Sequence, residues 1–436
     1  MAVDCQTLPS VPTSGTPARR APRPALGGSP ATPLLVLFGL NLVDELDRLA
    51  FAALTPEIRD AFGLGDDAIV AIGAVSGIFI LVGALPIGYL GDRASRLRIA
   101  AVAAIVWGAM SVLTGLAWAV WVLFAARLLS GIARTSNEVV HPSLLVDWYP
   151  HAVQPRVFQL HRLATPLSAS FALVVGGLGT LVGWRLTFVL SAAPTFVLLL
   201  LLLRLQEPIR GAGLPTYVAS AAQPRPLSFG AARRVLFGVG TLRRCWAAGF
   251  LLGTGFVAIM QLLSLFFEQV HGFGPWGRGV VQFAYGLGTV VGIMAGARVA
   301  MRATLTGRWV NLVHIIGAGF LVSAVALLAL ALTPWAPVAV GFTVLLGVGL
   351  GVWQPAYYPL VARIVPPRVR TQAYGWTLLF SGLGALLAVP LARYAQQESY
   401  RTAFAVLAAV VVVGAAVAAS ASGRVDDDVA RADAAA

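Results

Sequence analysis

The 436-residue chain has no lysine, and charged residues of all kinds make up only 11% of it. Soluble domains carry about 25% charged residues, so this shortage excludes a chain that is mostly surrounded by water. There are only two cysteines, Cys5 and Cys245. Two thiols so far apart provide neither a disulfide framework nor the spacing of metal ligands. We therefore expect no metal and no cofactor.

Apolar residues, in contrast, are abundant: they make up 58% of the chain, and the mean hydropathy is +0.82. This composition predicts a membrane protein whose solvent is mostly lipid. The formal charge is +13, and all of the positive charge comes from arginine. The arginines lie mostly in short loops between apolar runs, which is typical of membrane topology and does not favour a nucleic-acid partner.

Apolar runs long enough to cross a bilayer predict twelve transmembrane helices, because a spanning helix needs about 20 apolar residues. They form two pseudo-symmetric six-helix halves, 33–204 and 243–421, joined by a basic linker over 205–242. Short tails cover 1–32, which is rich in Pro, Ser and Arg and expected to be disordered, and 422–436. The predicted spans are 33–56, 68–91, 98–117, 119–146, 157–181, 184–204, 243–269, 277–301, 308–332, 336–362, 369–393 and 400–421.

The arginine distribution predicts the orientation. Of the 31 basic residues, only five fall in the loops that would be outside: Arg59, Arg185, Arg278, Arg393 and Arg401. Because basic loops stay on the cytoplasmic side, we expect a multi-pass protein of the cytoplasmic membrane with both termini inside. Two six-helix halves of this kind are built from inverted three-helix repeats in many transporters, with a substrate site at the midplane between the halves.

Several glycine pairs have the spacing that permits close helix approach: Gly73/Gly77, Gly292/Gly296 and Gly347/Gly351. The tenth span adds two prolines, Pro355 and Pro359, to its glycines. We therefore expect that span to bend.

The loop after the second span, Gly88-Tyr89-Leu90-Gly91-Asp92-Arg93-Ala94-Ser95-Arg96-Leu97-Arg98, is the most specific motif in the chain. It resembles the signature loop of the major facilitator superfamily. The resemblance implies a conformational latch formed by Gly88, Asp92, Arg93, Arg96 and Asp147. In that latch Asp92 docks near the eleventh helix, and Arg93 or Arg96 pairs with Asp147. The matching loop of the second half has Ala300 in place of the acid, so its latch is degenerate.

Polar and ionisable residues stand in mid-membrane on two predicted spans. The first carries Asn41, Asp44, Glu45, Asp47 and Arg48, and the fourth carries Arg127, Arg134, Glu138 and His141. A charge at the centre of a spanning helix costs roughly 2.5–3.5 kcal/mol on insertion scales, so these side chains cannot face lipid. The residues of the fourth span share one helical face. Asp44 and Arg48 are four apart and are predicted to pair, and depth places Asp47 near Arg127 and Asp44 near Arg134.

Two interpretations of this stripe are open. It is either a structural network that joins two helices, or a site for proton coupling, which is the default for ionisable residues at such depth. In the second case, Asp44 or Asp47 exchanges a proton while arginines move between that carboxylate and the substrate. Asp44, Asp47, Arg48, Arg127, Arg134 and Glu138 are the predicted coupling residues. Three arginines near the cavity also favour an anionic substrate.

The first span resembles that of spinster-type transporters in Asn41-Leu42-Val43-Asp44-Glu45-Leu46-Asp47-Arg48, and the fourth resembles it around Arg127 and Gly131. Spinster relatives move lysolipids or sphingolipids. The resemblance implies coupling roles for Asp47, Arg48 and Arg127. The chain departs from the family at Arg134, where the relatives have Glu; Glu138, one turn later, is the candidate substitute.

The second half is poor in charge. Its aromatic and polar residues on the seventh and tenth spans are expected to face the charged residues of the first half and to suit an amphipathic ligand. The predicted cavity residues are Asn41, Glu45, His141, Gln261, Trp353, Gln354, Tyr357 and Tyr358.

We therefore expect a monomeric secondary active transporter of a small or amphipathic, anionic organic solute, coupled to protons by alternating access. The alternatives are a spinster-like lysolipid exporter, an organic-anion symporter, and a non-transporting membrane sensor on the same fold. No nucleophile–base pair or nucleotide motif is evident, so an enzyme is not expected. The expected partners are a small-molecule or lipid-like substrate, protons and membrane lipid.

Overall fold

The computed structural model describes residues 26–214, 226–256, 259–387, 390, 391, 394 and 399–434, a few of them by backbone alone. Across these residues the chain is helical, and every predicted span coincides with a helix or a pair of helices. The fold is an all-α membrane fold. The spanning segments are α1 (Thr32–Ala53), α3 (Asp66–Gly91), α4 (Arg96–Leu116), α5 (Val120–Trp148), α6 (Gln154–Arg162) with α7 (Ala164–Leu202), α9 (Gly240–Phe256) with α10 (Ile259–His271), α11 (Pro275–Leu305), α12 (Val310–Leu332), α13 (Ala336–Val352) with α14 (Gln354–Ile364), α15 (Arg370–Ala385) and α17 (Tyr400–Ser420).

Several spans are interrupted. The long helix α7 contains Gly183 at φ +80°, a conformation open to glycine, and there the chain turns from the predicted fifth span to the sixth. The predicted tenth span divides at Trp353 into α13 and α14, with Pro355 in the first turn of α14. Trp353 itself keeps helical dihedral angles (φ −76°, ψ −25°), and Ala336–Ile364 is long and apolar enough to be one span, so the bend that we expected stays a prediction.

Among the described residues, three shorter helices lie wholly or mostly outside the predicted spans: α2 (Thr55–Phe62), α8 (Phe229–Gly238) and α18 (Val425–Ala434). The predicted C-terminal tail thus contains a folded, packed helix. Asp433 of α18 binds Arg363 through two hydrogen bonds of 2.5 and 2.6 Å. Asp428 accepts hydrogen bonds from the backbone N–H groups of Gly240 and Thr241, so it caps the N-terminus of α9.

In the described part of the chain, six helical segments are by themselves long and apolar enough to cross a membrane, and the bent pair α8–α9 would make a seventh. The helices α1 and α5 are not among the six. Each carries four side chains of Asp, Glu or Arg, which lower its hydropathy. The helices that are long enough to cross a membrane but too polar to be counted among the six are therefore the two that hold the predicted ion network.

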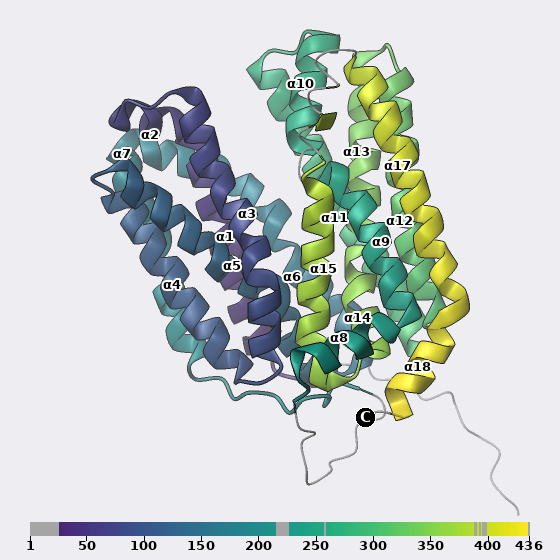
Figure 1. Ribbon diagram of the computed structural model, residues 1–436. Helices are drawn as coiled ribbons and strands as arrows, with labels where there is room; N and C mark the ends of the chain where they lie inside the picture. Colours follow the sequence, from purple (N-terminus) through teal and green to yellow (C-terminus); the bar gives the residue numbers. More distant parts are fainter. Residues whose placement is uncertain are drawn as a thin grey trace, which may run out of the picture.

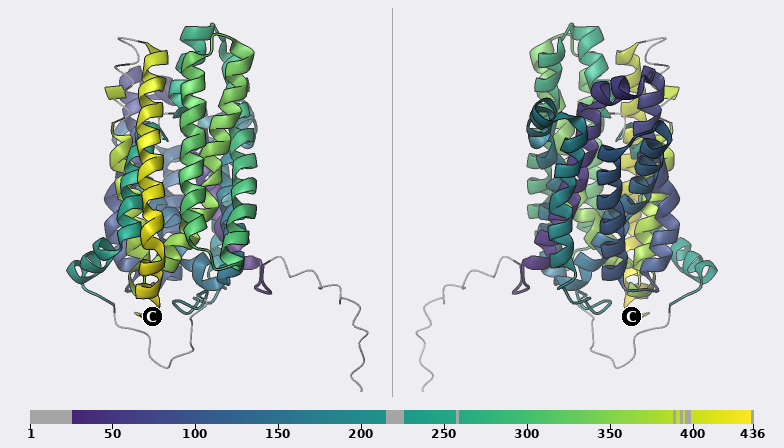
Figure 2. Two further views of the ribbon diagram at one scale, coloured as in Figure 1. Left: turned by 90° about the vertical axis from the view of Figure 1, so that its right-hand side faces the viewer. Right: turned by 90° about the vertical axis from the view of Figure 1, so that its left-hand side faces the viewer.

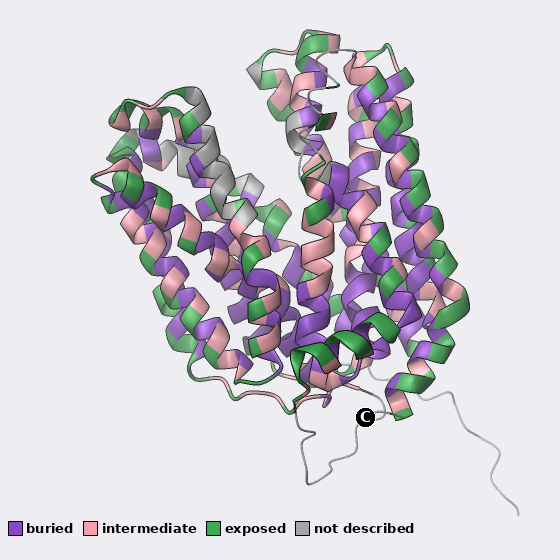
Figure 3. Ribbon diagram, in the orientation of Figure 1, coloured by how far each residue is buried: buried purple, intermediate pink, exposed green. Residues whose placement is uncertain are grey.

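The helices form two groups, α1–α7 and α9–α17 (Figure 1). We call the end of the bundle that carries the loop Gly88–Arg98, α8 and α18 the motif face. The two groups meet at the motif face and diverge toward the end that carries α2 and α10. Buried residues concentrate where the groups meet, while the outward sides of the helices are exposed (Figure 3).

Glycines set the packing within the second group. A Cβ added at Gly292 or Gly296 of α11 would lie 2.2 or 2.1 Å from a backbone oxygen of α13, at Val348 or Val352. Gly347 and Gly351 of α13 face α11 in the same way. The predicted close approach is present in this half. At Gly77 of the first half an added Cβ would meet nothing within 4 Å, so that glycine does not mediate a close approach.

Candidate functional site: an ion network above a closed motif face

The centre of the candidate site is a chain of ion pairs between α1 and α5. Arg134 lies between two carboxylates: its Nε is 3.0 Å from Asp44 Oδ2, and its Nη2 is 2.7 Å from Glu45 Oε1. Asn137, one turn further along α5, donates to Asp44 Oδ2 at 3.0 Å. The predicted proximity of Asp44 and Arg134 is therefore confirmed.

Arg48 completes this chain. Its Nε and Nη2 contact Glu45 Oε2 at 3.0 and 2.7 Å. The predicted pair of Asp44 with Arg48 is wrong, because Arg134 from α5 occupies Asp44 and Glu45 is one residue closer to Arg48. The Arg48 side chain is 50% exposed and that of Arg134 is 19% exposed, while those of Asp44 and Glu45 are 5% and 8% exposed, so this part of the network is accessible through its arginines.

A second cluster on the same helices is closed. Arg127 Nη1 lies 2.9 Å from Asp47 Oδ2, and Ser111 of α4 donates to Asp47 Oδ1 at 2.6 Å. The side chains of Arg127 and Asp47 are 4% and 2% exposed. The Arg127 guanidinium also lies 4.7 Å from the ring centre of Phe51. The predicted Asp47–Arg127 proximity is confirmed, and the pair is sealed from solvent.

Glu138 binds a different partner from the rest of the predicted network. Arg162 of α6 contacts Glu138 Oε1 at 3.0 Å and also donates to the hydroxyl of Tyr358. Tyr358 belongs to α14, in the other group of helices, and its ring stacks on Phe158 at 4.7 Å. The arginine therefore links the two halves through a carboxylate on one side and a phenol on the other.

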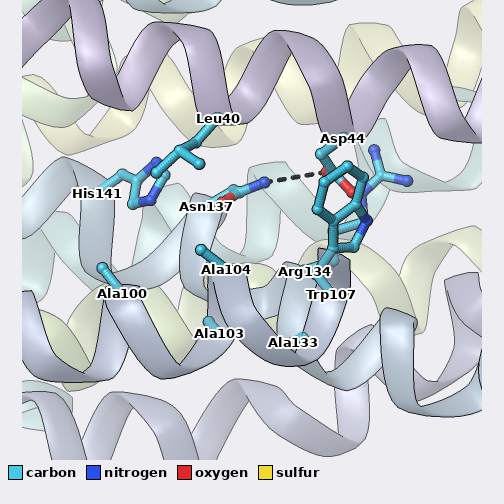
Figure 4. Close-up of a pocket in the computed structure, with 10 residues that line it drawn as sticks. All are labelled: Leu40, Asp44, Ala100, Ala103, Ala104, Trp107, Ala133, Arg134, Asn137 and His141. Atoms are coloured by element: carbon cyan, nitrogen blue, oxygen red, sulfur yellow. Dashed lines mark hydrogen bonds and ion pairs between the residues drawn. The ribbon is translucent and has the colours of Figure 1, made fainter. Parts of the chain in front are cut away.

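His141 lies inside the first half. Together with Asp44, Arg134 and Asn137 it lines a small hollow between α1, α4 and α5, with His141 at one end and Trp107 near the other (Figure 4). The His141 ring is 1% exposed and meets His161 edge-on, with ring centres 5.8 Å apart. Its Nδ1 has no hydrogen-bond partner among the described residues. Asn41, also buried, donates to the backbone oxygen of His161 at 3.5 Å.

The structure describes the side chains of only some of the predicted cavity residues of the second half. The Tyr357 hydroxyl lies 2.5 Å from Thr377 Oγ1, and Gln354 donates back to Leu350 O. Trp353 is half-buried and packs edge-on against Phe320 and Tyr357. The backbone of Gln261 belongs to α10, but its side chain lies outside the described residues.

The predicted latch is assembled at the motif face. Both carboxylate oxygens of Asp92 accept backbone N–H groups at the start of α15, from Thr371 at 2.8 Å and Gln372 at 3.0 Å. Burial raises the pKa of Asp92 to about 6, although these hydrogen bonds act to lower it. Gly88 and Gly91 allow the approach, since an added Cβ would lie 3.2 Å from Gln372 Cα and 2.4 Å from Thr371 Cγ2. Asp92 therefore docks on α15, as predicted.

Asp147 is the second anchor of the latch. Arg96 Nη1 lies 2.5 Å from Asp147 Oδ2, and Arg370 of the other half lies 2.7 Å from Asp147 Oδ1. All three side chains are about 1% exposed. Of the two predicted partners of Asp147, Arg96 is the one that binds it. Arg93 instead donates to Leu227 O at 2.6 Å and lies over the Tyr89 ring.

The networks also contain polar residues that were not predicted, among them Ser111, Asn137, Arg162 and Arg370. Asn137 lies three residues from Arg134, so the helical spacing used for its neighbours could have identified it. Arg162 and Arg370 stand at helix ends, where arginines are expected for topology alone. Their partners lie 24 and 223 residues away in the sequence, so no local pattern identifies these pairings.

Comparisons with known proteins agree with this geometry. A family model described as Major Facilitator Superfamily matches residues 37–313 and 303–433. Protein spinster of Drosophila melanogaster is 28% identical over 207 residues, which cover 47% of this chain and 34% of that protein. The sphingosine-1-phosphate transporter SPNS2 of Danio rerio is 27% identical over 185 residues, covering 41% of this chain and 36% of that protein. The alignments thus span about a third of the curated relatives.

Two solved structures share the fold. The human organic anion transporter MFSD10 (TETRAN) superposes with a TM-score of 0.73 at 17% identity, covering 89% of this chain and 99% of that one. A bacterial homolog of the human lysosomal transporter spinster, solved inward-facing and unoccupied, superposes with a TM-score of 0.59 at 21% identity, covering 94% and 99%. The two-half architecture of twelve helices follows from this fold. The chain belongs to the Major Facilitator Superfamily of membrane transporters.

Proposed function

We propose that the protein is a proton-coupled transporter of an anionic, amphipathic organic solute, with the proton carried at Asp44. The observation that carries this proposal is the position of Arg134 between the carboxylates of Asp44 and Glu45, next to the half-exposed Arg48. This accessible cluster contrasts with the sealed Asp47–Arg127 pair. The coupling site is therefore assigned to Asp44, and Asp47 to a structural ion pair.

Charge balance gives the mechanism. The α1–α5 network holds three carboxylates (Asp44, Glu45, Asp47) and three guanidinium groups (Arg48, Arg127, Arg134). An anion that binds Arg134 competes with Asp44 and leaves that carboxylate without a cation in a weakly polar medium. Protonation of Asp44 removes this cost. Each anionic charge bound is therefore accompanied by one proton, and the loaded and empty sites carry the same net charge.

The proposed chemical class of the solute is inferred from side chains of both halves. Guanidinium groups suit a carboxylate or phosphate group, and the half-buried Trp353 of the second half offers aromatic surface for an apolar portion, whereas Tyr357 and Tyr358 are buried in this state. The name of SPNS2 states that it transports sphingosine-1-phosphate, a phosphate-bearing lipid. A lysolipid or a hydrophobic organic acid would combine the same two features.

The closed motif face supports alternating access. Asp92, Asp147 and Arg162 each bind across the two halves, and these contacts must break for the motif face to open. We take the motif face as cytoplasmic, in the cell's cytoplasmic membrane, with both termini on that side. With this orientation the cytoplasmic side is closed, which corresponds to the outward-open state of a transporter.

Flux through purified protein in proteoliposomes tests the proposal. Anionic lysophospholipids, organic acids and neutral sugars are compared, with and without an imposed pH gradient, while an internal dye records proton movement. We expect anion flux that a pH gradient accelerates, with one proton per anionic charge. A membrane potential applied with valinomycin should have little effect on a singly charged solute.

Three variants sharpen this test. Asp44→Asn should carry its solute without moving protons, while Glu57→Gln, an exposed change on α2, should behave as the parent. Asp47→Asn should lose stability but keep the stoichiometry of the protein that remains folded. Proton-coupled flux in Asp44→Asn at the parental stoichiometry would exclude this proton site, and equal transport of neutral sugars would exclude the anionic class.

A further inference from the structure

The helix α8, in the predicted linker, is not explained by transport through the ion network. It runs from Phe229 to Gly238, and Ser228 caps its N-terminus by accepting the N–H of Ala231. Its axis is bent by 89° from that of α9. Because α9 begins a spanning segment, a helix at right angles to it lies along the membrane surface. Figure 2 shows α8 projecting from the side of the bundle at the motif face.

The apolar side of α8 is bound to both halves. Phe229 packs edge-on against Tyr89 of α3 and stacks on Trp376 of α15, with ring centres 5.9 and 6.3 Å apart. Phe237, two turns later, packs against Trp246 and Trp376 at 5.1 and 5.2 Å. These contacts hold α8 in a defined orientation at the motif face.

The exposed surface of α8 is basic: Arg233 lies on the same helical stripe as Phe229 and Phe237, one turn from each, and Arg234 lies beside it, while Ala232 and Leu236 form the buried side. Arg233 and Arg234 are both exposed, as is most of α8 (Figure 3). In the described part of the chain neither has a carboxylate partner. Arg243, at the adjoining start of α9, is exposed as well. The result is an interfacial amphipathic helix with aromatic anchors and paired arginines, the arrangement that binds acidic membrane surfaces.

We propose that α8 is a docking site for the headgroups of anionic phospholipids in the leaflet at the motif face, with Arg233 and Arg234 as the binding residues. A phosphodiester headgroup such as that of phosphatidylglycerol accepts the hydrogen bonds that two neighbouring guanidinium groups offer. The glycerol backbone and acyl chains then extend into the bilayer beside Phe229 and Phe237. This site is separate from the Arg134 network.

A fluorescence experiment measures this binding without reference to transport. Gly230→Cys places a label on α8, where an added Cβ meets nothing within 4 Å. Cys5→Ser removes one of the two native cysteines, and the other, Cys245, is buried. The labelled protein is reconstituted into vesicles that contain brominated phosphatidylglycerol or brominated phosphatidylcholine. We expect stronger quenching by the anionic lipid at equal mole fraction, and a smaller difference in 0.5 M KCl.

The decisive comparison is between two double variants that remove the same charge. Arg233→Gln/Arg234→Gln should weaken the preference for phosphatidylglycerol by about fivefold per arginine, or roughly twenty-five-fold. Arg298→Gln/Arg302→Gln, exposed on α11, should leave it unchanged. Equal losses in both variants would mean a general charge effect and would overturn the proposal. Equal quenching by the two lipids in the parent, or no quenching by either, would also overturn it.

Discussion

The two halves of the molecule share one architecture but are held together by different interactions. The first half contains the charged network of α1 and α5, whereas the second half has a glycine contact between α11 and α13 in which backbones touch. Close backbone packing leaves no room for a hydrated charge, and a charged network cannot pack so tightly. Under the proposed function, the first half would bind the solute and the proton, and the second half would be the more tightly packed partner.

The two halves also contribute different chemical groups to the contacts between them at the motif face. The first half contributes the carboxylates Asp92 and Asp147, and the second half contributes backbone N–H groups and Arg370. A Cβ added at Gly375 of α15 would lie 2.4 Å from Ala84 O, so the halves are also in close contact there. Opening this face must therefore break polar contacts and glycine packing together.

The largest effect is expected from Arg134→Ala, which removes the cation of the charged half. It leaves Asp44 and Glu45 with less compensation in a weakly polar site, and breaking a buried pair costs about 3–5 kcal/mol. We expect coupled flux to fall by about a hundredfold or more, measured per amount of monodisperse protein. Arg298→Gln, an exposed arginine on α11, is the control. Flux within twofold of the parent in Arg134→Ala would remove this residue from the mechanism.

The glycine contact of the second half is tested by Gly292→Ala. The added methyl group would lie 2.2 Å from Val348 O, so α11 and α13 must separate. Overpacking of this kind costs about 1–3 kcal/mol, and we expect a lower midpoint of thermal unfolding in detergent. Gly286→Ala on the same helix is the matched control, because its Cβ meets nothing within 4 Å. Equal midpoints for the two variants would show that the backbones adjust freely.

The contact between the halves should depend on pH through Asp92. Burial raises the pKa of Asp92 to about 6 when the motif face is closed, whereas an exposed carboxyl would have its ordinary value near 4. The closed state then binds the proton more tightly. Its advantage is complete below about pH 4 and is lost as the pH rises through 6.

Spin labels at Glu57→Cys and Gly279→Cys, one on each half, would report this change as a distance distribution. We expect the population with the motif face closed to grow between pH 7 and pH 4, and Asp92→Asn to flatten that part of the titration. A titration that Asp92→Asn leaves unchanged would assign the pH dependence to other groups, such as the α1 carboxylates.

The smallest effect is expected from the Glu268–Arg278 pair of the second half. Its contact of 2.7 Å joins side chains that are 42% and 28% exposed. Exposed pairs contribute about 0.2–1 kcal/mol, so Arg278→Gln should shift the unfolding midpoint by a degree or two at most and leave flux unchanged. A loss comparable to that of Arg134→Ala would contradict the view that ion pairs of the second half are only structural.

Hydropathy and helical spacing were enough to locate the spans and the charged faces of α1 and α5, whereas the latch motif was identified by its resemblance to a family's signature loop. Both signals are local, since a span is set by about 20 consecutive residues and a face by steps of three and four. The same local rules failed for Arg48, which was predicted to pair with Asp44, because the competitor Arg134 comes from a helix about 90 residues away.

The sequence by itself thus determined which residues are charged inside the membrane and on which helices they stand. Only the tertiary structure decided which carboxylate each arginine binds, which pairs are sealed, and that Arg162 and Arg370 cross between the halves. The physical reason is that ion pairing depends on distances of about 3 Å. Those distances are set by helix packing between segments up to 223 residues apart, which no local pattern encodes.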